Sequence, residues 1–396
     1  MLTYDEALQI ILKHAKPLDS REVSLNQCLN RVLSRNVYAP FAFPSFDNSA
    51  VDGFAIKFGE KLETKFRFKG EVPAGHLFKD RLNSGEAVAI FTGAPVPRGA
   101  EAVVMQECAQ RENGHVVIQK PVQAGDNIRL SGEDFKKGDL LIEKGTCLEP
   151  QHVALLASIG IEKVSVIRTP RVAILATGNE LVKPGEKLSA GKIYDSNTPL
   201  LQALLSNLEA NVIVLKKASD DVKALRKVIQ TGLDCDVLIV SGGVSVGKYD
   251  FVKTVLLEKG VSEIFWKVNI KPGKPLFFGK KEKTLVFGLP GNPVSVFVTF
   301  WEFVRPAILK MKGKNPEVLR AEGILTKSFR NGTRPHFIRV VAQNTRNGYR
   351  ITPLEGQGSH QVSTLARANA LLKIEPNQTL KLNERVSIEL FAGDQS

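Results

Sequence analysis

Residues that commonly build disulfide or zinc sites are scarce in this sequence. Its 396 residues include four cysteines and six histidines, with no C-x-x-C pair and no H-x-x-x-H spacing. A structural zinc site is therefore not expected. Four separate thiols in a chain of this length fit a reducing compartment better than a disulfide scaffold, so we expect a cytoplasmic protein.

Long apolar stretches are missing as well. No run of 18 apolar residues occurs, which excludes an ordinary transmembrane helix. The N-terminal residues Met1–Glu6 are polar and acidic, without the basic and apolar regions of a signal peptide. The sequence therefore predicts no membrane partner.

Basic residues are in excess but are not concentrated. The net charge is +13, from 54 Lys and Arg against 41 Asp and Glu, and such an excess favours anionic ligands. The longest basic runs are pairs such as Lys136–Lys137, and no basic tail or aromatic–basic stripe occurs. We therefore expect small anions rather than nucleic acid as ligands.

The first part of the chain combines helical segments with a β-rich module. At roughly 100–200 residues per domain, the chain has room for two to four domains. Thr3 and Glu6 form a capping-box pattern that starts a helix, and Pro17 ends it. A second short helix is expected over 24–32. Short apolar runs separated by Gly and Pro over 40–145 predict a β module with turns, followed by a helix at 150–160.

In the middle of the chain, predicted strands alternate with predicted helices. Strands are expected over 172–176, 212–215, 237–240 and 285–287, and helices over 198–209, 220–231, 252–259 and 293–309. This alternation predicts a parallel, doubly wound sheet with helices on both faces. Beyond a predicted linker at 310–316, short strand-like runs predict a small C-terminal β domain.

Three glycine-containing loops follow predicted strands of this sheet. They are T-G-N-E-L (177–181), S-G-G-V-S-V-G (241–247) and G-L-P-G-N-P-V-S (288–295). Glycines let backbone N–H groups approach an anion, and ligands of α/β sheets bind beyond the strand ends. One such loop would be read as an ordinary turn, but three in one domain favour an oxyanion site. Neither a dinucleotide-binding nor a Walker motif is matched.

A fourth loop carries two lysines between prolines. In K-P-G-K-P, Lys271 and Lys274 are three residues apart, and the prolines restrict the backbone that carries them. Two nearby ammonium groups repel each other unless an anion lies between them. The alternative is a solvated turn with exposed lysines.

Acidic residues gather in turn-rich segments, at 46–55 and at 127–134. Carboxylates suit a Mg²⁺ ion that bridges substrate phosphates. For Asp47 an Asx turn is the favoured alternative, and for Asp195 helix capping explains the sequence equally well. No Ser-His-Asp or Cys-His arrangement is visible, and His336 and His360, in polar segments, are interpreted as surface residues.

Taken together, these segments form an ordered set of motifs. Along the chain they are F-D-N-S-A-V-D-G-F-A, T-G-A-P-V-P-R-G-A-E-A-V-V-M-Q-E, N-I-R-L-S-G-E-D, T-G-N-E-L, I-Y-D-S-N, S-G-G-V-S-V-G-K-Y-D, K-P-G-K-P-L, G-L-P-G-N-P-V-S, R-P-H-F-I-R, G-Q-G-S and A-N-A-L-L. The set resembles the molybdopterin molybdenumtransferase family, whose eukaryotic relatives include the E domains of gephyrin and its plant counterpart. The resemblance runs from the N-terminal helix to the end of the chain.

The resemblance implies an elongated, four-domain chain that forms a homodimer. Domain I is discontinuous and helical to mixed, at 1–42 and 145–169, and domain II is the inserted β module at 43–144. Domain III is the doubly wound α/β domain that binds molybdopterin, at 170–314. Domain IV, at 315–396, is a small β-barrel-like domain.

The implied reaction inserts molybdenum from molybdate into adenylylated molybdopterin, requires Mg²⁺ and releases AMP. A separate molybdopterin adenylyltransferase would be a transient partner that supplies the substrate. The residues matching molybdate-binding positions are Lys271, Lys274, Ser295, Arg334 and Ser359. Those matching catalytic positions are Asp52, Asp134, Glu180 and Asp250, with Glu180 and Asp250 also assigned to the metal, and Asp52 and Asp134 expected to act across the dimer.

The strand-end loops are then expected to bind molybdopterin and AMP, through Thr177, Gly178, Ser241, Gly242, Gly243, Ser245, Gly247, Pro290, Gly291 and Asn292. Val51 and Phe54 stand where the family often has Met and Tyr, which puts any role of that tyrosine hydroxyl in doubt. Two other functions were weighed: a gephyrin-like interaction scaffold without catalysis, and a generic phosphate-binding transferase. The retained acidic and basic residues favour the enzyme.

Overall fold

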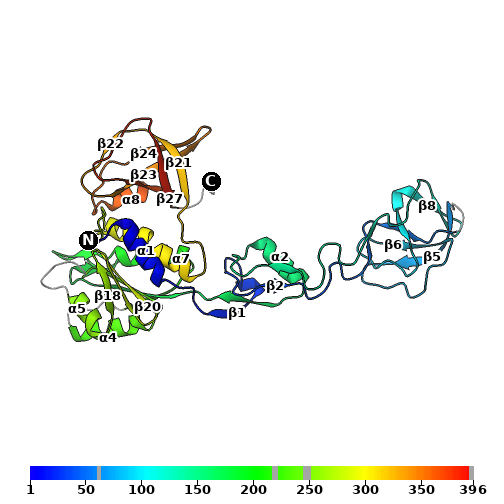
Figure 1. The fold of residues 1–396 in the computed structure, drawn as a ribbon, viewed down its shortest axis with the longest axis horizontal. Coiled ribbons are helices and arrows are strands. Elements are labelled where there is room, and N and C mark those ends of the chain that lie inside the picture. The colour runs from blue at the N-terminus through cyan, green and yellow to red at the C-terminus, as the bar shows by residue number, and fades with distance from the viewer. Residues whose placement is uncertain (60–63, 216–221, 244–250, 392–396) are drawn as a thin grey trace. The chain divides into compact units, whose positions relative to one another are not determined.

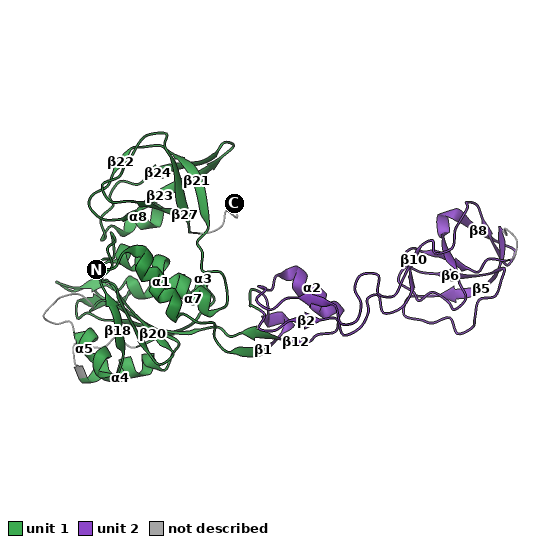
Figure 2. Cartoon of the chain, viewed as in Figure 1, with its two compact units in different colours: residues 1–22, 30–32, 165–396 green, residues 23–29, 33–164 purple. Residues whose placement is uncertain are grey.

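The structure is a computed structural model that describes residues 1–59, 64–215, 222–243 and 251–391. The chain forms two compact units, which Figure 2 shows in different colours. Unit 1 consists of Met1–Glu22, Asn30–Val32 and Ser165–Ser396, and unit 2 of Val23–Leu29 and Leu33–Val164. The chain passes between the units within β1 (Ser20–Ser24), on either side of Asn30–Val32, and within β12 (Lys163–Ile167).

A six-stranded sheet forms the centre of the α/β part of unit 1. In spatial order its strands are β16 (Asn211–Val214), β13 (Arg171–Ala176), β17 (Val237–Ser241), β20 (Thr284–Leu289), β19 (Phe277–Lys281) and β18 (Ser262–Trp266). The first four are parallel, as predicted, whereas β19 pairs antiparallel with both of its neighbours, β20 and β18. These two were not predicted, because short apolar runs beside a Pro-rich loop carry no clear strand periodicity.

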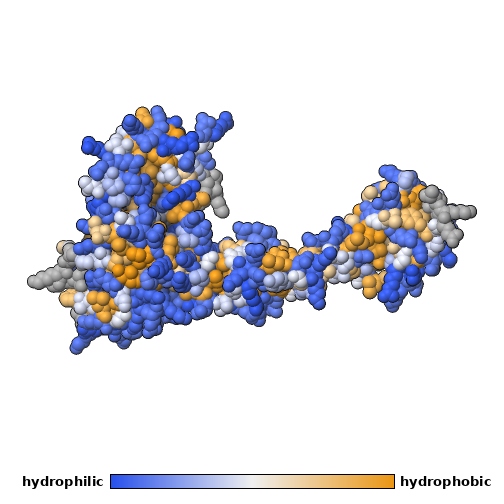
Figure 3. Space-filling view, in the orientation of Figure 1, coloured by the Kyte–Doolittle hydropathy of each residue, from blue (hydrophilic) through white to orange (hydrophobic). Residues whose placement is uncertain are grey.

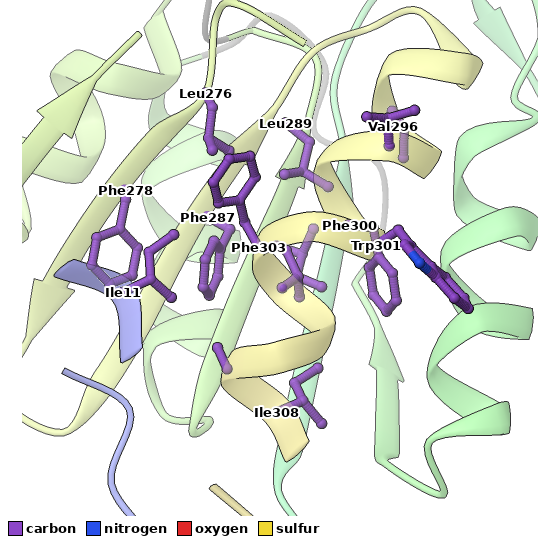
Figure 4. Packing of buried hydrophobic residues seen from close by; sticks show 14 of the residues in the cluster. Ile11, Leu276, Phe278, Phe287, Leu289, Val296, Phe300, Trp301, Phe303 and Ile308 are labelled. Carbon is purple, nitrogen blue, oxygen red and sulfur yellow. The ribbon is translucent and has the colours of Figure 1, made fainter. Parts of the chain in front are cut away.

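Both faces of this sheet are buried under helices, as the sequence predicted. Along β13, Val172 and Ile174 belong to one hydrophobic core, and Ala173 and Leu175 belong to another. The first core includes residues of α1 (Tyr4–His14), α3 (Asn197–Asn207) and the helical segment after β20, and Figure 4 shows part of its packing. The second core includes residues of α4 (Val222–Leu233) and α5 (Phe251–Glu258).

Two predicted helices differ from the structure. The expected helix at 24–32 is a single 3-10 turn, η1 (Leu25–Gln27), because Asn30 is left-handed (φ 60°) and the Val32 carbonyl accepts a hydrogen bond from the Ile167 N–H. The expected helix at 293–309 is α6 (Pro293–Thr299), a π-helical turn η3 (Phe300–Val304) and α7 (Arg305–Met311). Pro306 has no N–H to donate to the Glu302 carbonyl, which favours the irregular turn.

The C-terminal part of unit 1 is a closed five-stranded barrel (Figure 1). Its strands, in order around the barrel, are β21 (Arg320–Leu325), β24 (Gly348–Pro353), β23 (His336–Thr345), β25 (Ala370–Ile374) and β27 (Arg385–Leu390). The barrel has its own hydrophobic core. The helix α8 (Val362–Arg367) and the pair β22 (Phe329–Arg330) and β26 (Thr379–Leu380) complete this part, while β14 (Leu181–Val182) and β15 (Ile193–Tyr194) pair beside the sheet.

Unit 2 contains the β-rich segment that the sequence predicted, together with residues on either side of it. Its main sheet has the order β7 (Ala102–Met105), β4 (Gly53–Ile56), β6 (Glu86–Ile90), β5 (Lys65–Val72), β9 (His115–Ile118) and β8 (Ala109–Glu112). Two short antiparallel pairs accompany it, β2 (Val37–Tyr38) with β11 (Leu140–Ile142) and β3 (Asn48–Ser49) with β10 (Ile128–Arg129). The turn η2 (Gln106–Cys108) and helix α2 (Pro150–Ser158) also belong to this unit.

Across the described residues, no helix is long and apolar enough to cross a membrane. Hydrophilic residues cover much of the visible face of each unit, with hydrophobic residues exposed in separate patches (Figure 3). This distribution agrees with the ordinary hydrophobic fraction of the sequence, 43%.

The expectation that His336 lies at the surface is wrong, whereas His360 is exposed as expected. His336 begins β23 with a side chain 2% exposed, and it pairs with Lys271 through an isolated parallel bridge. Burial, followed by the charges of Lys271, Arg339 and Arg334, lowers the pKa of His336 to about 4. The ring is therefore neutral at physiological pH.

Substituting Gly323 by alanine should destabilise the barrel. A Cβ at this position would lie 2.6 Å from the Tyr349 carbonyl oxygen and 2.8 Å from the Ile351 side chain. Such overpacking against backbone should cost about 2–3 kcal/mol of unfolding free energy. The matched variant Gly332→Ala meets nothing within 4 Å and should change stability little. Equal denaturation midpoints for the two variants would contradict this packing.

Replacing His336 by glutamine should reduce the loss of stability at acidic pH. Because the pKa falls from 6.5 in the unfolded chain to about 4 in the folded one, the unfolded state takes up the proton first. The native state should therefore lose on the order of 3 kcal/mol as the pH falls through this window, and keep its stability above it. Melting temperatures measured near about pH 7.5 and about pH 4.5 should differ less for His336→Gln than for the wild type. An identical acid sensitivity would show that His336 is not buried in the neutral form.

Candidate functional site

Four of the predicted ligand-binding loops lie at the same edge of the six-stranded sheet. Ala176 pairs with Ser241, and Ser241 pairs with Leu289, so the three strands end side by side where their loops begin. The antiparallel β19 pairs its first residue, Phe277, with Gly288. The K-P-G-K-P loop precedes β19 and therefore reaches this edge as well. An α/β sheet binds its ligand at such an edge.

Asn197, at the start of α3, ties two of these loops together. Its side-chain Nδ2 donates to Ser241 Oγ at 3.0 Å and to the Gly291 carbonyl oxygen at 2.8 Å. Asp195 caps α3: its Oδ1 accepts from the N–H groups of Asn197 and Thr198, and its Oδ2 accepts from the Thr198 hydroxyl. Capping, one of the two alternatives for Asp195, is therefore present, and the sequence analysis missed Asn197.

Two loop glycines have a positive φ that favours glycine, and at Gly242 the neighbouring backbone also leaves no room for a side chain. Gly178 has φ +135°, and a Cβ there would lie 2.6 Å from Glu180 Oε1. Gly242 has φ +83°, and its Cβ would lie 2.9 Å from the Thr177 carbonyl oxygen. The N–H groups of Thr177 and Gly242 donate to the Ser241 and Leu289 carbonyls, at 3.1 Å each. These two N–H groups therefore hold the loops to each other.

The K-P-G-K-P loop is bound to the barrel through its backbone. The Lys271 N–H donates to the Pro335 carbonyl at 2.8 Å, and the Phe337 N–H donates to the Lys271 carbonyl at 2.8 Å. Arg334 Nη1 donates to the Ile270 carbonyl at 3.1 Å. The side chains of Lys271 and Lys274 are exposed, whereas Arg334 is half-buried. The Lys271 backbone and the Arg334 guanidinium thus meet where the sheet loop joins the barrel.

The G-Q-G-S loop of the barrel reaches the loop that follows β20. Asn292 Nδ2 donates to Ser359 Oγ at 2.9 Å, and the Val294 N–H donates to the Ser359 carbonyl at 3.3 Å. Ser295 is buried, and its carbonyl accepts a hydrogen bond from the Thr299 hydroxyl at 2.7 Å. The barrel therefore contacts the ligand edge of the sheet at two places, which bring Arg334 and Ser359 to this edge.

The loop that carries Lys271 and Lys274 packs against α6, the helix that carries Ser295. Gly273 has φ +107°, and a Cβ there would lie 2.5 Å from Thr299 Cγ2. The Lys274 carbonyl accepts hydrogen bonds from the N–H groups of Val268 and Leu276, at 3.0 Å each. The loop conformation is therefore determined on both sides of the two lysines. Together with the barrel contacts, this brings the segments carrying all five predicted molybdate-binding residues to one region.

Asp52 and Asp134 belong to unit 2, whereas the other predicted site residues belong to unit 1. Asp52 Oδ1 accepts hydrogen bonds from the backbone N–H and the hydroxyl of Thr92, at 2.7 Å each, and these bonds lower the pKa of Asp52. Asp134 is exposed. Asp47 accepts from the distant Ser131 N–H at 2.7 Å, so it forms a tertiary contact rather than the expected Asx turn. The segments 46–55 and 127–134 are thus neighbours.

Three predicted residues, Ser245, Gly247 and Asp250, lie outside the described residues. Glu180 is exposed, and the described part of the chain contains no group of three or more His, Cys, Asp or Glu placed to hold a metal ion. Gly243 (φ +68°) and Pro290 lie in the loops at the sheet edge, and Gly291 and Asn292 are exposed there.

Comparison with known families divides the chain into three matched regions. The MoeA N-terminal region (domain I and II) matches residues 2–160. A probable molybdopterin binding domain matches residues 173–310, and the MoeA C-terminal region (domain IV) matches residues 322–391.

Relatives match nearly the whole chain. The molybdopterin molybdenumtransferase of Haemophilus influenzae is 38% identical, with 99% of each chain covered, and that of Bacillus subtilis is 35% identical, with 93% of this chain and 89% of the relative covered. A crystal structure of the molybdopterin biosynthesis MoeA protein of Pyrococcus horikoshii matches with a TM-score of 0.85 at 32% identity, covering 99% of this chain and 100% of that one. The chain belongs to the molybdopterin molybdenumtransferase family of enzymes.

Proposed function

We propose that this enzyme inserts molybdenum from molybdate into adenylylated molybdopterin and releases AMP, as a step of molybdenum cofactor biosynthesis. The observation that carries the proposal is the meeting of the Lys271 loop, Arg334 and Ser359 at the ligand edge of the sheet. The relatives named molybdopterin molybdenumtransferase support the substrate and the transferred metal.

Molybdate is a tetrahedral dianion, and the proposed set of ligands suits it. Lys271, Lys274 and Arg334 supply positive charge, and Ser295 and Ser359 supply hydroxyl donors. Charge-assisted hydrogen bonds to an oxyanion are stronger than neutral ones, and a guanidinium offers several donors in a fixed plane. Because the backbone on both sides of the lysines is hydrogen-bonded, little further ordering of this loop is needed when the anion binds.

The remaining strand-end loops are proposed to hold molybdopterin and AMP. The contact residues in this proposal are Thr177, Gly178, Ser241, Gly242, Gly243, Ser245, Gly247, Pro290, Gly291 and Asn292. The hydrogen bonds from Asn197 to the Ser241 and Gly291 loops support a common, pre-formed surface. Hydrolysis of the phosphoanhydride by water would release AMP. The two dithiolene thiols of molybdopterin would then bind the molybdenum, and one molybdate oxygen would leave as water with the two thiol protons.

We further propose that Mg²⁺ is required and that Glu180 and Asp250 hold it. A Mg²⁺ ion is commonly bound by one or two carboxylates, with water and substrate phosphates completing its shell, so it needs no larger cluster of protein ligands. The exposed Glu180 carboxylate beside the Gly178 loop is compatible with that role. When bound, the ion would neutralise charge on the phosphoanhydride.

A homodimer with shared sites is also part of the proposal. Asp52 and Asp134 would act on the substrate held by unit 1 of the other subunit, and the hydrogen bonds from Thr92 keep Asp52 ionised for that role. The enzyme is proposed to work in the cytoplasm and to receive its substrate from a molybdopterin adenylyltransferase.

Removing the two loop lysines should abolish molybdate binding without unfolding the protein. In the double variant Lys271→Ala/Lys274→Ala the anion loses two of its three cations, and the affinity should fall by at least about a hundredfold. Isothermal calorimetry with molybdate measures this directly. The control Lys136→Ala/Lys137→Ala removes the same charge from exposed residues of unit 2 and should bind as the wild type does. Unchanged affinity in the first variant would reject the assignment.

Mixed dimers should reveal whether the sites are shared. One subunit would carry Lys271→Ala/Lys274→Ala, the other Asp52→Ala, and two different affinity tags would isolate the heterodimer. If Asp52 acts across the dimer, one site contains both defects and the other contains none, so AMP release from adenylylated molybdopterin should recover to about half the wild-type rate. Each homodimeric variant should be inactive. A heterodimer as inactive as the parents would place Asp52 in the site of its own subunit, whereas an active Asp52→Ala homodimer would place it outside the reaction.

A further inference from the structure

A fully buried arginine lies directly beneath the loop that carries Ser359. Arg339, on β23, is 0% exposed, although arginine is among the residues least often buried. Among the described residues no carboxylate pairs with it, and its Nη1 is buried without a hydrogen-bond partner. A buried charge without a counter-ion is destabilising, so the position calls for an explanation beyond packing.

Within the described part of the chain, the hydrogen bonds of the Arg339 guanidinium go to neutral groups of the segment 356–364. Arg339 Nη2 donates to the carbonyls of Gly356 and Gly358, at 2.8 Å and 3.2 Å, and Nε donates to the Thr364 hydroxyl at 2.8 Å. The residue after Gly358 is Ser359. The guanidinium therefore binds two carbonyls of the loop and a hydroxyl of α8, the helix that follows the loop.

Two glutamines complete the support of this loop. Gln357 exchanges hydrogen bonds with the Arg339 backbone, its Oε1 accepting from the N–H and its Nε2 donating to the carbonyl, at 3.0 Å each. Gln361 Oε1 accepts from the Gly358 N–H at 2.6 Å. With Arg339, these side chains determine the loop that presents the Ser359 hydroxyl and carbonyl to Asn292 and Val294.

The charge of Arg339 acts on His336, the residue of β23 that pairs with Lys271. Burial is the main cause of the lowered pKa of His336, and the charges of Lys271, Arg339 and Arg334 lower it further. The same imidazole is thus within electrostatic range of two proposed molybdate ligands and of Arg339. A bound dianion near these groups would compensate a charge that the protein itself leaves unpaired.

We propose that Arg339 is a positioning residue of the anion site, which holds the Ser359 loop in its binding conformation and supplies a buried positive charge that favours a doubly charged oxyanion. This inference rests on the proposed function, since it assumes that the oxyanion binds beside Ser359. Arg339 does not itself contact the anion in this proposal.

The two roles predict different responses to the charge of the ligand. Perrhenate is a tetrahedral oxyanion like molybdate but carries one negative charge instead of two. Loss of loop positioning should weaken both anions by a similar factor, whereas loss of a nearby positive charge should weaken the dianion more. The ratio of the two dissociation constants therefore reports on charge separately from structure.

Calorimetric titrations with molybdate and perrhenate should be compared for the wild type, Arg339→Gln, Arg339→Lys and Thr364→Val. Arg339→Gln should weaken molybdate by about tenfold more than it weakens perrhenate. Arg339→Lys and Thr364→Val keep the charge but lose hydrogen bonds to the loop, so both anions should weaken by similar factors, about threefold to tenfold. If Arg339→Gln does not fold, these two variants still test the positioning role. The control Arg346→Gln, at an exposed residue of the barrel, should leave both affinities unchanged.

The outcomes separate this inference from the proposed function. Absence of molybdate binding in the wild type would contradict the proposed function itself. Normal molybdate binding in the wild type, with unchanged affinities in all three Arg339 and Thr364 variants, would overturn only the role of Arg339. An equal weakening of both anions in Arg339→Gln would overturn its electrostatic part.

Discussion

The backbone pairing between the Lys271 segment and the start of β23 is the contact on which the candidate site depends. Two hydrogen bonds of 2.8 Å connect Lys271 with Pro335 and Phe337, so the loop before β19 pairs with the first residue of β23. Together with the contacts of Asn292 and Val294 with Ser359, this pairing brings Arg334 and the two lysines to the same region. Backbone bonds of this kind depend little on side-chain identity, which leaves the side chains at this junction available for binding.

Three cationic residues lie around the buried His336, where burial makes positive charge unfavourable. Lys271, Arg334 and Arg339 all act on His336, which burial and these charges keep neutral. Cations held close together repel each other, and a tetrahedral dianion is a natural partner for such a group. Under the proposed function, the empty protein would give up some stability in return for affinity toward an oxyanion.

Much of this fold was predictable, and the exceptions have physical causes. Alternating apolar strands and helices over 172–309 predicted the doubly wound part, and the ordered loops predicted which residues meet at the sheet edge. Periodicity could not reveal the antiparallel β18 and β19, or the π-helical turn before Pro306. Asn197 was missed because its hydrogen bonds reach residues 44 and 94 positions away. Arg339 was missed because its side chain binds the loop at Gly356. No local sequence pattern encodes either contact. The four-domain boundaries and the residues of the site remain predictions.

The most direct test of the account is a crystal of the protein soaked in molybdate, with anomalous diffraction measured at the molybdenum absorption edge. The account predicts one strong anomalous peak at the junction of sheet and barrel, with oxyanion oxygens within hydrogen-bond distance of Lys271, Lys274, Arg334 and Ser359. An ordered molybdenum bound elsewhere, with this junction empty, would contradict it.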